Sequence, residues 1–217
     1  MSDSDELEET SASGRAANAK LPEQIRPAIW SVLVLTVLTG CVFPLLLAIA
    51  RPLFPRQSGG SLAIRGGGVS GSELIGQEFT RPEYFQSRPS AAGSGYDGTA
   101  SGGTNLGPNN PKLVNGSPEF AGIRQLAEAY RQRNGLASDA AIPVDAVTRS
   151  GSGLDPHISL ANALLQAPRV ARARGLGEDV VRRLVTDHLE GRQFGFLGNP
   201  RVSVLDLNMA LDQMEKK

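Results

Sequence analysis

Residues 28–50 read AIWSVLVLTVLTGCVFPLLLAIA, a run of 23 positions without one charged side chain. At a rise of about 1.5 Å per residue, a helix of this length spans roughly 34 Å, enough to cross the hydrocarbon core of a bilayer once. Arg26 precedes the run and Arg51 and Arg56 follow it, so charged groups bracket the apolar segment. The pattern predicts one N-terminal transmembrane helix at residues 27–50.

Three interpretations of this apolar run compete. Residues 48–50 (Ala-Ile-Ala) have the small-x-small form of a signal cleavage site, but the run exceeds the roughly 7–15 apolar residues of a secretory signal. Residues 38–41 (Leu-Thr-Gly-Cys) fit a lipoprotein processing site, with the only cysteine of the chain, Cys41, at the acylated position. Nine further apolar residues follow that cysteine, where a lipoprotein becomes polar. We therefore favour a retained membrane anchor.

Charge is balanced overall but unevenly distributed. The chain has 22 basic and 22 acidic residues, yet residues 1–27 carry a net charge of −3 and residues 51–217 a net charge of +3. This positive charge is too small for a nucleic-acid-binding surface, and no basic stripe interleaved with aromatic residues is present. The Ser- and Glu-rich composition predicts a disordered acidic tail at residues 1–26. A single cysteine allows no internal disulfide.

The part beyond the anchor, residues 51–217, is predicted to form one soluble domain. Short apolar runs between glycines at residues 61–79 predict two or three brief strands. Residues 86–116 are so rich in Gly, Ser, Asn and Pro that we expect no regular structure there. A loop of this length inside a compact domain is more often functional than idle.

The second half of the domain has helical periodicity. The first helix is predicted to begin at Ser117 as N-cap, with Pro118 in the first turn, and to end at Asn134. The others are predicted from Ser159 to Arg174, kinked or split at Pro168, and from Gly177 onward, while residues 201–205 (RVSVL) predict a strand followed by a short helix. The fold class is therefore a single N-terminal transmembrane helix plus one mixed α/β (α+β) domain, mostly helical in its second half.

The motifs of common enzymes are missing from the sequence. It contains no GxxxxGK[ST] phosphate loop, no DKTGT phosphorylation sequence, no HExxH and no cysteine cluster. His188 falls on the apolar face of a predicted helix, which favours a partly buried structural role, and His157 beside Asp155 is too little to define a site. Gly93, Gly95 and Gly98 spell GxGxxG, but no strand precedes them and no helix follows. We predict no catalytic residues, no metal ligands and no stably bound cofactor.

Six polar strings, occurring in order behind the apolar run, resemble a known family. They are LIGQEF (74–79), YFQSRPS (84–90), SGGTNLGPNNP (101–111), IPVDAVTRSGSGLDPHIS (142–159), QAPRVARARG (166–175) and VLDLNMALD (204–212). Together they are similar to the KdpC family, the C subunits of the high-affinity Kdp potassium-transporting ATPase of bacteria and archaea. The similarity covers roughly residues 24–214; the long acidic tail and Cys41, in place of a small residue such as glycine, depart from the family pattern.

The resemblance implies a role in the cell membrane, which is the inner membrane where there are two. Such subunits span the bilayer once, with the N-terminus in the cytoplasm and the soluble domain outside. Their partners are the channel-like potassium-translocating subunit and the ATP-hydrolysing P-type subunit. The family is described as a catalytic chaperone that raises the ATP affinity of the ATPase subunit in a transient ternary complex. This chain is then a non-catalytic accessory subunit; the alternative is a stand-alone membrane-anchored extracytoplasmic binding protein, with or without a lipid modification.

The resemblance also implies a nucleotide contact, because a Ser/Gly-rich segment with a downstream glutamine is similar to the signature sequence of ABC transporters. The matching residues are Ser150, Gly151, Ser152, Gly153, Asp155 and Gln166. Glycines can turn successive N–H groups toward one anion, which is one physical reading of this segment. The other reading is a tight turn before the helix capped by Ser159, with Asp155 bonded to local backbone. A domain outside the membrane would also not meet cytoplasmic ATP.

A second set of residues is predicted to dock on the partner subunits. In the apolar helix, Gly40 and Pro44 would let another helix approach closely. In the Gly-rich loop the set is Ser101, Gly102, Gly103 and Asn105, anchored by Arg88. Because exposed loops make few buried contacts, we expect substitutions of these loop glycines to change the stability of the domain little.

Overall fold

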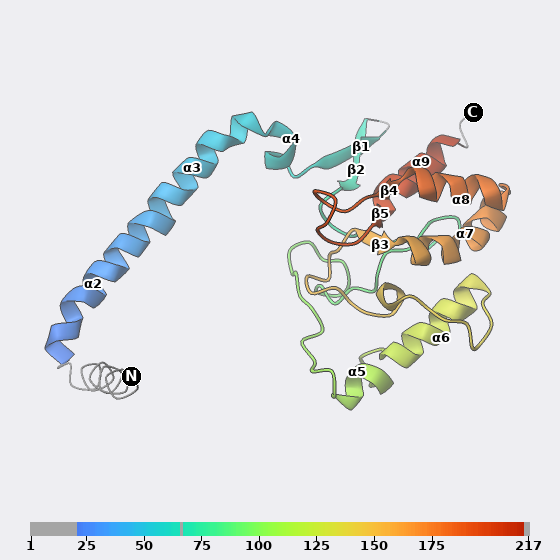
Figure 1. Ribbon diagram of the computed structural model, residues 1–217, viewed down its shortest axis with the longest axis horizontal. Coiled ribbons are helices and arrows are strands. Elements are labelled where there is room, and N and C mark those ends of the chain that lie inside the picture. Colours follow the sequence, from blue (N-terminus) through green and yellow to red (C-terminus); the bar gives the residue numbers. More distant parts are fainter. Residues whose placement is uncertain (1–20, 66, 215–217) are drawn as a thin grey trace, which may run out of the picture. The chain divides into compact units, whose positions relative to one another are not determined.

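The computed structural model describes residues 21–65 and 67–214. The chain divides into two compact units, Met1–Gly59 and Gly60–Lys217, and each is described here by itself (Figure 1). The predicted acidic tail lies outside the described residues up to position 20. The division at Gly59 falls later than the predicted end of the membrane helix, because short helical turns follow the apolar run.

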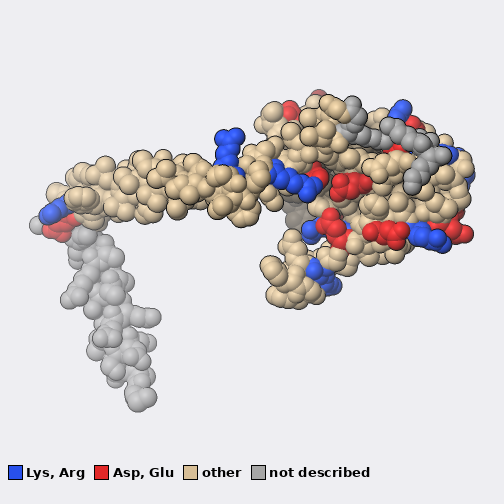
Figure 2. Space-filling model, turned by 90° about the horizontal axis from the view of Figure 1, so that it is seen from above, with Lys and Arg blue, Asp and Glu red and all other residues tan. Residues whose placement is uncertain are grey.

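The first unit is one run of helix through the apolar segment. It comprises α2 (Leu21–Val37), the π-helical turn η1 (Leu38–Val42), α3 (Phe43–Ala50), the 3₁₀ turn η2 (Arg51–Leu53) and α4 (Pro55–Ser58). In the described part of the chain, residues 22–53 form the one helix long and apolar enough to cross a membrane. The face seen in Figure 2 carries charged side chains at the ends of this helix and none between them. The predicted helix is therefore confirmed.

This helix starts earlier than predicted and contains a wide turn. Residues 21–26, which the composition places in the disordered tail, are helical; Pro22 and Glu23 in the first turn both suit a helix N-terminus. At the wide turn, the Phe43 N–H donates to the carbonyl of Leu38, five residues back. Pro44 has no N–H and its ring crowds the carbonyl four residues earlier, which explains a local widening at this point.

The second unit begins with the predicted hairpin. Strands β1 (Leu62–Arg65) and β2 (Gly68–Ser72) pair antiparallel. Residues 73–110 then contain no helix or strand, which confirms the prediction for positions 86–110. The remaining elements are α5 (Pro111–Asn115), α6 (Ile123–Asn134), η3 (Val144–Ala146), β3 (His157–Ser159), α7 (Leu160–Arg174), α8 (Glu178–Asp187), β4 (Leu189–Glu190), β5 (Arg201–Ser203) and α9 (Val204–Met214). Strands β3, β5 and β4 form an antiparallel sheet in that order.

The predicted start of the first helix at Ser117 is wrong. Ser117 and Phe120 instead exchange two backbone hydrogen bonds in a turn, and α6 starts after Gly122. A Cβ on Gly122 would lie 2.3 Å from the Gly116 nitrogen, so the close approach of two backbone segments fixes this boundary. The short helix α5, which was not predicted, is capped by the Asn110 side chain, which accepts from the Lys112 N–H at 2.9 Å.

Helix α7 follows the prediction at both ends. The Ser159 hydroxyl caps it by accepting from the Asn162 N–H at 3.1 Å, and Gly175 ends it in a left-handed conformation. The predicted split at Pro168 is wrong, since α7 stays one helix across it. Buried neighbours on both sides, Ala167 and Val170, hold the helix against the core and offset the lost hydrogen bond.

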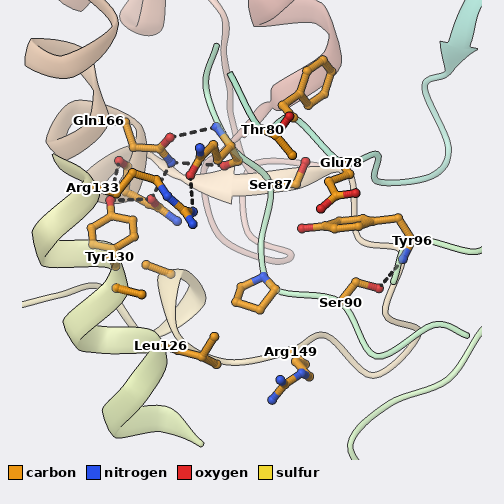
Figure 3. Close-up of a pocket in the computed structure, with 16 residues that line it drawn as sticks. Glu78, Thr80, Ser87, Ser90, Tyr96, Leu126, Tyr130, Arg133, Arg149 and Gln166 are labelled. Atoms are coloured by element: carbon orange, nitrogen blue, oxygen red, sulfur yellow. Dashed lines mark hydrogen bonds between the residues drawn. The ribbon is translucent and has the colours of Figure 1, made fainter. Parts of the chain in front are cut away.

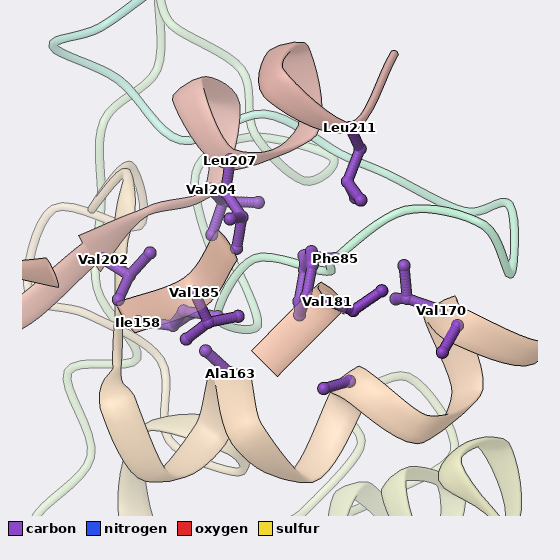
Figure 4. Close-up of a cluster of buried hydrophobic side chains, with 12 residues drawn as sticks. Phe85, Ile158, Ala163, Val170, Val181, Val185, Val202, Val204, Leu207 and Leu211 are labelled. Atoms are coloured by element: carbon purple, nitrogen blue, oxygen red, sulfur yellow. The ribbon is translucent and has the colours of Figure 1, made fainter. Parts of the chain in front are cut away.

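The core lies between α7, α8, α9 and the sheet (Figure 4). Phe85 enters it from the irregular segment and is fully buried. The other members come from the regular elements: Ile158, Ala163, Ala167, Val170, Ala171, Val181, Val185, Val202, Val204, Leu207 and Leu211. Burying one such large side chain stabilises the fold by about 1.5–3 kcal/mol. Phe85, with the partly buried Phe79 beside it, thus ties the irregular segment to the helices.

Candidate functional site

Gln166 on α7 lies at the centre of a buried polar network (Figure 3). Its side chain is only 1% exposed. The carbonyl Oε1 accepts from the Gln86 N–H and from the Arg169 guanidinium, both at 2.8 Å. The amide Nε2 donates to the Gln86 carbonyl (3.1 Å) and to Asn162 Oδ1 (2.9 Å). Because these four hydrogen bonds use both donors and both acceptor positions of the amide, Gln166 fixes the irregular segment onto α7.

Arg169, one turn further along α7, extends this network. Its guanidinium donates to Asn134 Oδ1 at 2.9 Å and to the backbone carbonyls of Pro82 and Tyr84. Burial, with a smaller contribution from the neighbouring Arg133, lowers the pKa of Arg169 to about 10. The side chain therefore holds residues 82–84 by charge-assisted bonds to backbone, without a carboxylate partner among those bonds.

A cavity of about 340 Å³ opens beside this network. Gln166, Tyr96, Arg133 and Arg149 are among its lining residues, and Figure 3 shows the two arginines on different sides of it. Arg133 donates to Gln86 Oε1 at 2.6 Å. Tyr96 donates to the Arg88 carbonyl at 2.5 Å, and its burial raises the pKa of the phenol to about 12. Tyr96 therefore remains a neutral donor at physiological pH.

The segment 150–155 forms a tight turn that uses its own N–H groups. The Gly153 N–H donates to the Ser150 carbonyl at 3.2 Å. The Leu154 N–H donates to Ser152 Oγ (3.1 Å) and the Asp155 N–H to Ser150 Oγ (3.4 Å). Gly153 has a φ of +69°, which favours glycine at this position. These contacts support the turn interpretation of this segment.

The structure brings the two predicted Gly/Ser-rich segments together. The Gly102 N–H and the Ser101 hydroxyl both donate to the Ser152 carbonyl, at 2.9 and 3.0 Å. The Ser90 hydroxyl donates to the Gly153 carbonyl at 2.6 Å. A groove of about 310 Å³ runs between residues 103–106 and 147–151. We call this surface, residues 101–106 with 147–153, the glycine groove.

The loop glycines and Gln166 differ from what the sequence predicts. The expectation that the loop glycines make few contacts is wrong for Gly103, because a Cβ there would lie 2.7 Å from the Gly151 carbonyl oxygen. At Gly102 a Cβ would have 3.8 Å to its nearest neighbour, so a small side chain fits there, although the backbone of Gly102 contacts the turn. Gln166 lines the cavity beside the buried network and not the glycine groove. The predicted nucleotide-contacting residues therefore divide between two places.

A family model described as KdpC, K+-transporting ATPase, c chain, matches residues 25–213. The chain belongs to the KdpC family. The resemblance carried by the six polar strings is confirmed. The match spans both the apolar helix and almost all of the second unit.

Individual relatives agree with this assignment. The potassium-transporting ATPase KdpC subunit of Mycobacterium tuberculosis is 50% identical over 192 residues, covering 88% of this chain and 98% of that protein. The subunit of the same name from Methylococcus capsulatus is 51% identical over 191 residues, covering 87% and 97%. That of Koribacter versatilis is 50% identical over 186 residues, covering 85% and 92%.

In this KdpC-family chain, Asp155 joins the turn to the sheet through an ion-pair cluster. Arg88 Nη1 lies 2.7 Å from Asp155 Oδ2. The His157 N–H donates to Asp155 Oδ1 at 3.0 Å, and its ring Nδ1 lies 3.3 Å from the same atom. Burial alone would raise the pKa of Asp155, but the bonds from His157 and Arg88 outweigh it and hold the pKa at about 2. Arg88, predicted to anchor the docking loop, therefore anchors the turn through Asp155.

The low pKa of Asp155 predicts a pH-dependent loss of stability. The value falls from 3.8 to about 2 on folding, so the stabilising contribution is complete above pH 3.8 and disappears as the pH falls toward 2. We expect Asp155→Asn to cost roughly 1–2 kcal/mol in unfolding free energy at neutral pH, discounted for the partial exposure of the group. Urea denaturation of the full chain at several pH values measures this difference. An equal difference in unfolding free energy between wild type and variant at pH 7 and at pH 2 would contradict this prediction. Asp139→Asn, on an exposed loop, is the control.

The buried polar stripe on α7 was not predicted from the single motifs. Asn162, Gln166 and Arg169 recur at helical spacing on a face that also carries Ala163 and Val170. Polar side chains at core positions of an amphipathic helix are the signal that would have found it. Among the described residues, no group of three or more His, Cys, Asp or Glu could hold a metal ion.

Proposed function

We propose that this KdpC-family chain is an accessory subunit of a potassium-transporting ATPase complex and hydrolyses no ATP itself. Its partners in this proposal are the channel-like potassium-translocating subunit and the ATP-hydrolysing P-type subunit. The observation that carries the proposal is the match to relatives named as subunits of this ATPase over both the apolar helix and the domain. The N-terminus is proposed to be cytoplasmic and the domain extracytoplasmic.

The apolar helix supports the assembly role. Within the part of the chain that the structure describes, nothing buries the most apolar part of this helix. Around Gly40, inside the wide turn η1, there is open space, with no atom within 4 Å of a Cβ built there. Pro44 lies in the turn that follows. A small residue in open space lets another helix approach closely, and packing of this kind drives association in membranes.

The Gly40→Leu variant tests the assembly role. Because a Cβ here meets no atom of the described residues, the folding of the chain should be unchanged, whereas association with the larger subunits should weaken by about tenfold. The measurement is the yield of each subunit after mild detergent extraction and affinity purification of the complex. Ala48→Leu also introduces a leucine elsewhere on the helix and serves as the control.

Two outcomes of this experiment would count against the proposal. An unchanged yield for Gly40→Leu would show that the helix does not pack at this position. A wild-type chain that purifies alone, with a lipid on Cys41, would support the stand-alone binding protein instead. In the structure Cys41 is an exposed free cysteine within η1.

The second part of the proposal is the chaperone role, in which the chain raises the ATP affinity of the ATPase subunit in a transient ternary complex. A direct nucleotide contact at the turn Ser150–Asp155, at the edge of the glycine groove, requires a domain that faces the cytoplasm; with the domain outside the membrane, as proposed here, the chain raises the ATP affinity through its partner subunits. Gln166 is better explained as structural, because its amide already makes four hydrogen bonds inside the fold. We propose the exposed edge of the same groove, including Ser101 and Asn105, as a docking surface for a partner subunit.

A further inference from the structure

The loop between β4 and β5 exposes large apolar side chains. Its sequence at residues 191–200 is GRQFGFLGNP. Phe194 is 87% exposed, Phe196 69% and Leu197 47%. The loop leaves the sheet as a separate projection (Figure 1). Several neighbouring apolar residues without cover on one projection are unusual for a surface that stays in water. We call residues 194–197 the aromatic tip.

The aromatic tip has a fixed shape. The Gln193 N–H donates to the Leu197 carbonyl at 3.0 Å, and the Leu197 N–H donates back to Gln193 at 2.9 Å. The Phe196 N–H donates to the same Gln193 carbonyl at 3.2 Å. Phe194 has a φ of +52°, a conformation that favours Asn or Gly and disfavours a bulky side chain. In the free domain both the exposure and the backbone of this phenylalanine are unfavourable, which indicates a compensating contact.

Charged groups surround the base of the tip. Glu190 on β4 pairs with Arg201 on β5 at 3.0 Å, and the ring of His157 lies 3.8 Å from the same carboxylate. Arg192, at the start of the loop, is exposed. An apolar centre with aromatic anchors inside a polar rim is the usual anatomy of a protein–protein interface.

We infer that the aromatic tip is an anchor that inserts into an apolar cavity of one of the larger subunits of the transport complex, with an acidic group at the edge of that cavity facing Arg192. This inference rests on the proposed assembly role. A fixed backbone at the tip does not strengthen binding to a fluid bilayer, which has no fixed shape. It does strengthen binding to a protein cavity of matching shape, because the anchor is already ordered and pays no further entropy cost on binding.

Cysteine labelling of the full chain tests the inference. In a Cys41→Ser background, Leu197→Cys keeps both phenylalanines and places one thiol on the tip. We expect a hydrophilic maleimide to react about tenfold or more slowly with this thiol in the three-subunit complex than with the chain alone in the same detergent. Val144→Cys, at a side chain 73% exposed on η3, is the control and should react at the same rate in both samples. Protection at neither position, or at both, would overturn the assignment.

A variant and a lipid sample complete the experiment. Phe194→Asn with Phe196→Ser removes both rings, and Asn tolerates the positive φ, so the melting temperature should stay unchanged. We expect this variant to associate with the larger subunits about tenfold or more weakly. Undiminished association would overturn the inference. Protection of the Leu197→Cys thiol in lipid nanodiscs without partners would also overturn it, in favour of membrane insertion. If the wild-type chain does not purify with the larger subunits, the proposed assembly role itself is wrong.

Discussion

The Gly153→Val variant is expected to lose about 3–5 kcal/mol of unfolding free energy. A Cβ at this position would lie 2.5 Å from the Gly102 carbonyl oxygen and 2.7 Å from the Ala92 nitrogen. Both neighbours are backbone atoms, so neither can move without displacing its segment. The left-handed backbone at Gly153 adds the strain of a β-branched residue in that conformation. Since the contact between Gly102 and Gly153 holds together the two segments that border the glycine groove, the proposed docking surface should be lost together with stability.

Gly151→Ala is the matched control for this prediction, because it adds a Cβ in the same turn with nothing within 4 Å. Its stability should remain within about 0.5 kcal/mol of wild type. Urea denaturation of the full chain in detergent measures both variants. Similar stabilities for the two would show that the close contact between the segments does not hold in solution.

Gln166→Ala should be similarly destabilising, by about 3–4 kcal/mol. It leaves the Gln86 backbone groups without their partners and takes one acceptor from the buried Arg169. Each unsatisfied buried group costs about 1–3 kcal/mol, and more where the group is charged. Gln132→Ala, on the exposed face of α6, is the control and should cost little. Thermal and urea unfolding of the full chain provide the measurement.

The same variant separates a structural role of Gln166 from a nucleotide contact. In complexes that retain the folded variant, we expect the Michaelis constant of the ATPase for ATP to stay unchanged. If the Michaelis constant for ATP instead rises roughly 2- to 12-fold while stability is unchanged, Gln166 contacts ATP directly. A rise of this size corresponds to the loss of one hydrogen bond. A large loss of stability with a constant Michaelis constant would support the buried network as its only role.

Several elements could be predicted from the local chemistry of the sequence alone. The apolar run at 28–50 specifies a helix long and apolar enough to cross a membrane, because its length and lack of charge depend on no other part of the chain. Ser159 and Gly175 specify the two ends of α7, since a cap acts within one turn of its own helix. The six polar strings gave the family, which the comparisons confirm.

Only the tertiary structure decided which polar residues are buried and which segments meet. The start of α6 at Gly122 depends on the backbone near Gly116, and the unbroken α7 depends on its packing on the core. Gln166 bonds to Gln86 across 80 residues of sequence, and the loop at 101–103 meets the turn at 151–153 in the same way. No local pattern encodes such pairs, because a buried hydrogen bond is specified by both partners and by the fold that brings them together.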